Sequence, residues 1–110
     1  LAEQLEEKAR MATQLSLRTD ARSVFRGSEV TVHGRLRTRQ GQPVSGETVA
    51  ILFGGVGAAA EQMKRIGTGE TDANGRYQTT VTIPETTGIG RWSLIAVFPG
   101  DDRYRRATAK

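Results

Sequence analysis

An alternation of apolar and polar residues over 29–39, "EVTVHGRLRTR", constrains the fold more than any other feature of the sequence. One face of this segment would carry Val30, Val32, Gly34 and Leu36, and the other would carry Thr31, His33, Arg35, Arg37 and Arg39. A side-chain period of two belongs to an extended strand with one buried face and one face in water. The segment is therefore predicted to be a half-buried antiparallel strand.

Six further segments carry strand signals. They are "QLSLRT" (14–19), "ETVAILF" (47–53), "MKRIGTGET" (63–71), "RYQTTVTI" (76–83), "RWSLIAVF" (91–98) and "RYRRATA" (103–109). Turn-forming residues fill the connectors 40–43, 72–75, 86–88 and 99–102. This spacing predicts an all-β, seven-stranded antiparallel sandwich. The small, glycine-rich segment 54–62 is expected to be a mobile loop between the third and fourth strands.

Length and composition set broad limits on the class of protein. A chain of 110 residues suits one domain with a single two-layer core. The absence of cysteine rules out a disulfide framework and thiolate zinc sites, and the formal net charge of +4 permits contact with acidic surfaces. The sequence begins without methionine and shows no signal peptide, so we expect a piece of a longer protein.

The first residues differ from the rest of the chain. Leu1, Leu5, Ala9 and Ala12 recur at spacings of three and four, which predicts a short helix. Its apolar stripe is too thin for an isolated helix to be stable in water. We therefore expect residues 1–13 to be a helical linker or the end of a preceding helical region, and residues 14–110 to be the sandwich domain.

The stretch "TDANGRY" has two interpretations. Glu70, Asp72 and Asn74 at alternate positions, followed by Gly75, imitate the first half of a calcium-binding loop. Val81 stands where that loop would need its bidentate glutamate. As a tight turn, Asp72 would cap its own loop and Gly75 would supply a positive φ. The turn is the favoured interpretation, with calcium as the alternative.

His33, the only histidine, is predicted to point outward among arginines, with no nucleophile in a catalytic arrangement. We therefore expect no enzymatic activity and no cofactor. The ladder of His33, Arg35, Arg37 and Arg39 is the first part of a candidate interaction surface. A solvated face that discourages pairing between sheet edges is the favoured alternative. The aromatic residues fall at core-like positions, so no specific nucleic acid is expected as a partner.

The segment 91–98 raises a separate question. If Trp92, Leu94, Ala96 and Phe98 point inward, with Trp92 as the aromatic centre of the core, then Ile95 and Val97 point outward. An exposed apolar pair requires a cover, from a neighbouring element or from a partner. Ile95 and Val97 therefore form the second part of the candidate surface, and a weak homo-oligomer through them or through the N-terminal helix is one expectation.

Three motifs carry a resemblance to a known family. "GQPVSGETVAI" from Gly41, "TDANGRY" from Thr71 and "GRWSLIAVFPGDDRY" from Gly90 resemble the bacterial and archaeal immunoglobulin-like (Big-type) domains of surface proteins. Those domains also resemble prealbumin-like and carboxypeptidase regulatory-like domains. The resemblance covers the chain from Thr13 onward and implies a Greek-key immunoglobulin-like sandwich. It supplies no catalytic or ligand-binding residues.

The same resemblance implies a function class. It points to a non-enzymatic structural, spacer or adhesion module of a larger extracellular or cell-envelope protein, with membrane anchoring of that parent protein left open. Two alternatives stand beside it: a binding module for carbohydrate, calcium or an acidic polymer, and an accessory domain of an enzyme.

Overall fold

The computed structural model describes residues 10–19, 27–84 and 92–110. The described strands are β1 (Thr13–Leu15), β2 (Arg18–Thr19), β3 (Glu29–Thr38), β4 (Thr48–Gly55), β5 (Lys64–Glu70), β6 (Arg76–Thr82), β7 (Trp92–Phe98) and β8 (Ala107–Ala109). A single-turn 3-10 helix, η1 (Ala60–Gln62), precedes β5, and the described ranges contain no α-helix.

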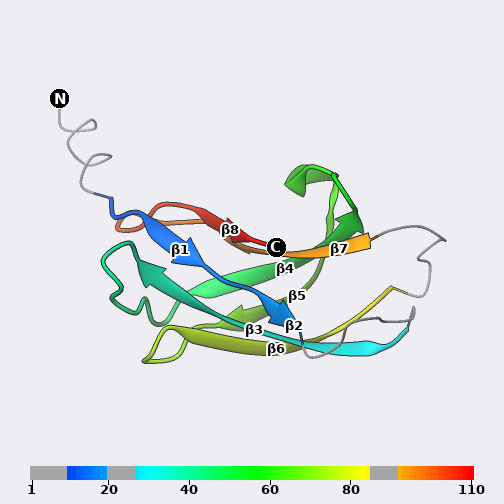
Figure 1. The fold of residues 1–110 in the computed structure, drawn as a ribbon, viewed down its shortest axis with the longest axis horizontal. Helices are drawn as coiled ribbons and strands as arrows, with labels where there is room; N and C mark the ends of the chain where they lie inside the picture. Colours follow the sequence, from blue (N-terminus) through cyan, green and yellow to red (C-terminus); the bar gives the residue numbers. More distant parts are fainter. Residues whose placement is uncertain (1–9, 20–26, 85–91) are drawn as a thin grey trace.

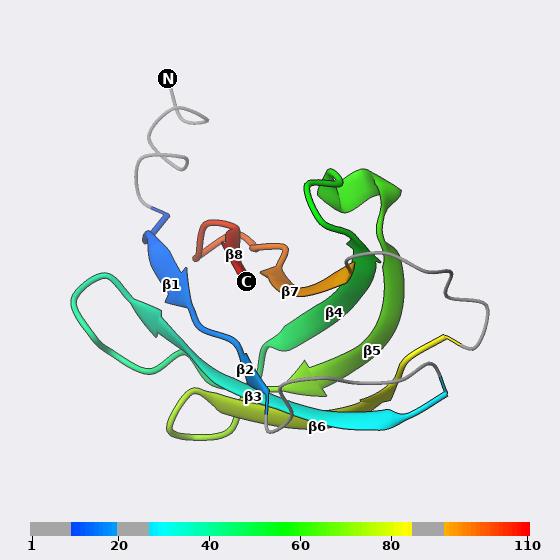
Figure 2. The ribbon, with the colours of Figure 1, turned by 45° about the vertical axis from the view of Figure 1, so that its right-hand side comes forward.

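Two antiparallel sheets face each other and form a sandwich (Figures 1 and 2). In the first sheet, β1 and β2 pair with one edge of β3 and β6 pairs with its other edge. The second sheet has the order β5-β4-β7-β8. The predicted all-β sandwich is confirmed at this level.

The core lies between the two sheets and follows the predicted alternation in β3, β4 and β6. Its main cluster contains Val30, Val32, Val49, Ile51, Phe53, Tyr77, Val81, Ile83 and Ala96. A smaller cluster of Leu36, Val44 and Phe98 lies beside it. Inward and outward residues alternate in β3 and β6 as the sequence predicted, because each strand has one face on the core.

The predicted first strand, 14–19, is divided in two. β1 ends at Leu15 and β2 begins at Arg18, with Ser16 and Leu17 between them. Both short strands still pair with β3, so the division is a local break in one edge. The described residues therefore form eight strands where seven were predicted.

The predicted N-terminal helix is wrong for residues 10–13, while residues 1–9 lie outside the described ranges. Met11 forms a parallel bridge with Tyr104. Its N–H donates to the Arg103 carbonyl at 2.9 Å, and its carbonyl accepts from the Arg105 N–H at 2.8 Å. These backbone groups are paired with another segment, so they are unavailable for a helical turn. Thr13 already begins β1.

The glycine-rich segment 54–62 is only partly a loop. β4 continues through Gly54 and Gly55, and η1 occupies its last three positions. Gly54 is buried against the Met63 side chain. The pairing of β4 with β5 shifts between Ile51 and Leu52, which bends this hairpin strongly (Figure 2).

The predicted exposure of Ile95 and Val97 is wrong. They are only 8% and 7% exposed, although they lie on the opposite face of β7 from Ala96. β7 is a central strand, and Leu52 of β4 is the direct cross-strand neighbour of Ile95. The burial comes from within the chain, so these residues give no support to a homo-oligomer.

Trp92 was predicted to be the aromatic centre of the core, and this is also wrong. It is 42% exposed. Trp92 is the first residue of β7 and pairs with Gly55 at the end of β4, beyond the main cluster. Its ring stacks on Phe53, with centroids 5.2 Å apart and planes 9° from parallel. Trp92 therefore covers one end of the core.

This placement predicts a modest cost for Trp92→Ala, about 1–2 kcal/mol of unfolding free energy, from one lost ring contact and partial burial. Phe53→Ala is expected to cost about 3–5 kcal/mol, because Phe53 belongs to the core. Urea unfolding of both variants measures the difference. Equal costs would show that the tryptophan is as integral to the core as the phenylalanine.

A candidate interaction surface

The break between β1 and β2 brings the chain close to β3 at Ser16. The Ser16 N–H donates to the Arg35 carbonyl at 3.0 Å, and the Ser16 hydroxyl oxygen accepts from the Arg35 N–H at 2.9 Å. The Ser16 hydroxyl thus takes the place of a backbone carbonyl as the acceptor for β3. The Ser16 carbonyl instead accepts from the Tyr77 hydroxyl, at 2.6 Å, and this bond ties β6 to the broken strand.

Gly34 makes this approach possible. A Cβ at this position would clash with the Ser16 carbonyl and would stand 2.8 Å from Cε1 of Tyr77. Only glycine leaves room for the backbone of another strand at such a contact. Burial raises the pKa of Tyr77 to about 12, so its hydroxyl remains a proton donor throughout the physiological range.

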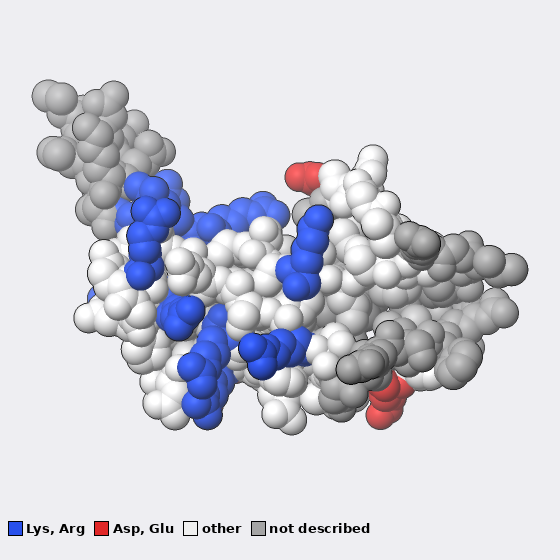
Figure 3. Space-filling view, in the orientation of Figure 1, with Lys and Arg blue, Asp and Glu red and all other residues white. Residues whose placement is uncertain are grey.

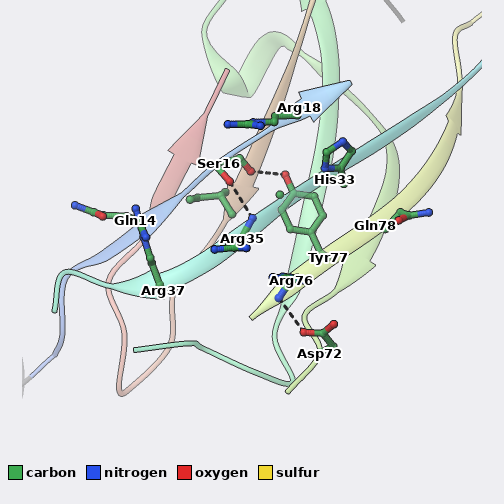
Figure 4. A pocket seen from close by; sticks show the side chains of 12 residues that line it. Gln14, Ser16, Arg18, His33, Arg35, Arg37, Asp72, Arg76, Tyr77 and Gln78 are labelled. Atoms are coloured by element: carbon green, nitrogen blue, oxygen red, sulfur yellow. Dashed lines mark hydrogen bonds between the residues drawn. The ribbon is translucent and has the colours of Figure 1, made fainter. Parts of the chain in front are cut away.

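Basic side chains gather on the outer face of the first sheet, in cross-strand rows (Figure 4). In one row Gln14 pairs with Arg37. In the next, Ser16 adjoins Arg35, which pairs with Arg76, and in the third Arg18 pairs with His33, which pairs with Gln78. We call this surface the basic face, defined by Arg18, His33, Arg35, Arg37 and Arg76.

The basic face surrounds a depression of about 940 Å³. Its lining also includes the inward-facing Leu15, Gly34 and Tyr77, because the sheet is interrupted between β1 and β2. Figure 3 has the orientation of Figure 1 and shows Lys and Arg side chains spread over the left and centre of the surface, where β1 and β2 lie, with no Asp or Glu side chain visible among them. Asp72 is the one acidic residue among the described lining residues.

The structure brings together some of the predicted surface residues and separates others. His33, Arg35 and Arg37 lie side by side on β3 and are exposed, as the alternation predicted. Arg39 is exposed in the turn after β3, outside the depression. Arg18 and Arg76 were missed. The outward position of each followed from alternation in its own segment, but only the strand register places them beside β3.

The turn at 72–75 is confirmed. The Asp72 carboxylate oxygen Oδ1 accepts from the N–H of Asn74 at 2.8 Å and of Arg76 at 3.0 Å. Gly75 has a φ of +74°, and a Cβ there would clash with the Leu36 carbonyl. The N–H groups of Arg76 and Asn74 hold the pKa of Asp72 below its ordinary value. The carboxylate oxygen considered as a calcium ligand thus stabilises its own turn.

A second capped turn lies between β7 and β8. The Asp101 oxygen Oδ1 accepts from the N–H groups of Arg103 at 2.8 Å and Tyr104 at 3.0 Å, and these bonds lower the pKa of Asp101. Burial, followed by a hydrogen bond with Asp101, raises the pKa of Glu47. The described residues contain no group of three or more His, Cys, Asp or Glu side chains that could hold a metal ion.

No family model matches the chain, and no curated protein matches it. Within the described ranges, no helix has the length and apolar character needed to cross a membrane.

The contact at Gly34 predicts that Gly34→Ala costs about 3 kcal/mol or more, because the new methyl group meets backbone atoms that cannot rotate away. Gly55→Ala is the matched control: Gly55 also lies in a strand, and an added Cβ there meets nothing within 4 Å. Urea midpoints of the two variants check the prediction. Similar midpoints would mean that the broken strand moves aside at little cost.

The two capped turns should make the unfolding free energy depend on pH in the acid range. Asp72 and Asp101 have folded-state pKa values lowered from 3.8, so they stabilise the fold above that pH. This contribution is lost as the pH falls through the lower, folded-state pKa values. Asn retains the acceptor oxygen without titrating, so the double variant Asp72→Asn, Asp101→Asn is expected to lose less stability than the parent between about pH 5 and pH 2.

Urea unfolding at a series of pH values measures this difference, and Glu47→Gln is the control of opposite sign. The pKa of Glu47 is raised from 4.5, so its contribution is present at low pH and is lost as the pH rises through the folded-state pKa. Parallel pH profiles for the parent and the Asn variant would mean that the caps contribute nothing through their charge.

Proposed function

We propose that the chain is a non-enzymatic, immunoglobulin-like module that acts as a spacer or adhesion element in a larger cell-surface or envelope protein. The supporting observation is the direction of the two terminal strands. β1 and β8 run the same way, and Met11 and Tyr104 are joined in a parallel bridge (Figure 1). The chain thus enters at one end of the sandwich and β8 points toward the other end. Such a path suits modules joined end to end.

The strand order supports the immunoglobulin-like part of the proposal. If β1 and β2 together are strand A, then β3, β4, β5, β6, β7 and β8 correspond to B, C, C′, E, F and G. The sheets then read A-B-E and C′-C-F-G, with A, B and E in one layer and C, F and G in the other, as in immunoglobulin-like sandwiches. The chain changes sheets after β3, after β5 and after β6, as Greek-key connections require.

A spacer must carry tension between its neighbours. Tension applied at the two ends of this chain would pull β1 and β8 in opposite directions along their length. Hydrogen bonds join residues 11–13, which lead into β1, to residues 103–105, which precede β8. The Met11 N–H donates to the Arg103 carbonyl, the Arg105 N–H donates to the Met11 carbonyl, and the Thr13 hydroxyl donates to the Arg105 carbonyl at 2.7 Å. Because the segments are parallel, the load falls on these bonds together.

Single-molecule pulling from the two ends tests the proposal. Thr13→Val removes the hydroxyl bond to Arg105, and Thr31→Val removes the 3.1 Å bond between the Thr31 and Thr80 hydroxyls on β3 and β6. Each change is expected to cost about 0.5–1.5 kcal/mol at equilibrium. We expect one distinct unfolding step, with a lower force for Thr13→Val than for Thr31→Val. Equal forces, or gradual extension without a step, would overturn the spacer role.

A further inference from the structure

We infer that the basic face is a binding site for a linear acidic polysaccharide. This inference goes beyond the spacer role and rests on different contacts, those of the outer surface of β1, β2, β3 and β6. It names both the residues of the site and the chemical class of the ligand.

The first argument is the density of charge. Arg35 and Arg37 lie two residues apart on β3, a spacing of about 6.7 Å along a strand. Arg76 stands opposite Arg35 and Arg18 stands opposite His33, about 5 Å away on the neighbouring strands. A chain of anionic sugars lying along residues 33–37 of β3 would therefore meet a basic side chain at each of the three outward positions His33, Arg35 and Arg37.

The second argument is that little of this charge is compensated within the described part of the chain. No described residue forms an ion pair with the guanidinium groups of Arg18, Arg35 or Arg37, and all three side chains are exposed. Like charges directly opposite each other in a sheet are destabilising, as in the pair Arg35 and Arg76. Asp72, whose Oδ1 accepts two backbone N–H groups, is the one described acidic residue in the lining, and its carboxylate interacts favourably with the charge of Arg76 alone among the four arginines. A polyanion across the face would remove the repulsion.

The third argument selects a polysaccharide over a nucleic acid. Gln14 and Gln78 flank the basic side chains and Ser16 adjoins Arg35, and their amide and hydroxyl groups can form hydrogen bonds with sugar hydroxyls. Single-stranded nucleic acids need exposed aromatic rings for base stacking. Tyr77, the aromatic residue that lines the depression, is 2% exposed. Arginine guanidinium groups also match carboxylates in a two-pronged geometry, which suits uronic acids.

The test compares two triple variants with the same loss of charge. The face variant is Arg18→Gln, Arg35→Gln, Arg37→Gln, and the control is Lys64→Gln, Arg65→Gln, Arg106→Gln, whose positions are exposed and lie outside the depression. Calorimetric titration with polygalacturonate at about 0.15 M NaCl gives the affinity, with neutral dextran as the blank. Urea midpoints establish that both variants are folded.

We expect the parent to bind polygalacturonate and not dextran. The face variant should bind at least about tenfold more weakly and show a smaller salt dependence, while the control should stay within about threefold of the parent. A third variant, Arg35→Lys, Arg37→Lys, retains the charge, and we expect intermediate affinity because the two-pronged contact is lost.

Three results would overturn the inference. If polygalacturonate does not bind the parent, the face is only a solvated surface. If both triple variants lose affinity equally, the binding reflects net charge and not this site. If oligothymidylate of matched charge binds more tightly than polygalacturonate at the same salt concentration, the ligand belongs to another class.

Discussion

The first sheet depends on one close contact, in which the backbone of Ser16 lies against Gly34 and accepts the Tyr77 hydroxyl. Three strands meet there: the broken edge, β3 and β6. Tyr77 is buried, and a buried hydroxyl without an acceptor would be costly, so the tyrosine depends on the carbonyl that the broken edge presents to it. Any side chain at position 34 would push the edge outward and separate that bond. The glycine in the middle of an otherwise regular strand is therefore a packing requirement and not a weak point in the sheet.

The same contact shapes the outer surface. Ser16 satisfies the Arg35 N–H with its hydroxyl, so β1 and β2 both remain in register with β3 on either side of the break. That register sets Gln14 beside Arg37 and Arg18 beside His33. The interruption also opens the depression among these side chains. The arrangement of charge on the basic face thus follows from a steric constraint on the inner side of the sheet.

Much of the fold could be predicted from sequence, and the failures have identifiable physical causes. The alternation in β3 and the turn at Asp72 were confirmed, because each is decided locally, by strand geometry and by a side chain that caps its own loop. β7 was misread because Ile95, Ala96, Val97 and Phe98 are all buried, and a continuous apolar run contains no signal of which face is inward. The exposure of Trp92 and the extended backbone at Met11 depend on which other segments these residues pair with. The surface was predicted on β3 alone, since Arg18 and Arg76 join it only through register.

The proposed spacer and the inferred binding site share one segment of the chain. Met11 and Thr13 join the N-terminal segment to the 103–105 segment, while Gln14, Ser16 and Arg18, a few residues later, line the depression. Tension that separated residues 11–13 from residues 103–105 would also act on the edge strand of the basic face. A polyanion bound to both Arg18 and Arg37 would hold that edge against β3, because a ligand that binds only the attached form stabilises it by mass action. Binding and resistance to tension are then coupled, because both require the broken edge strand to stay in register with β3.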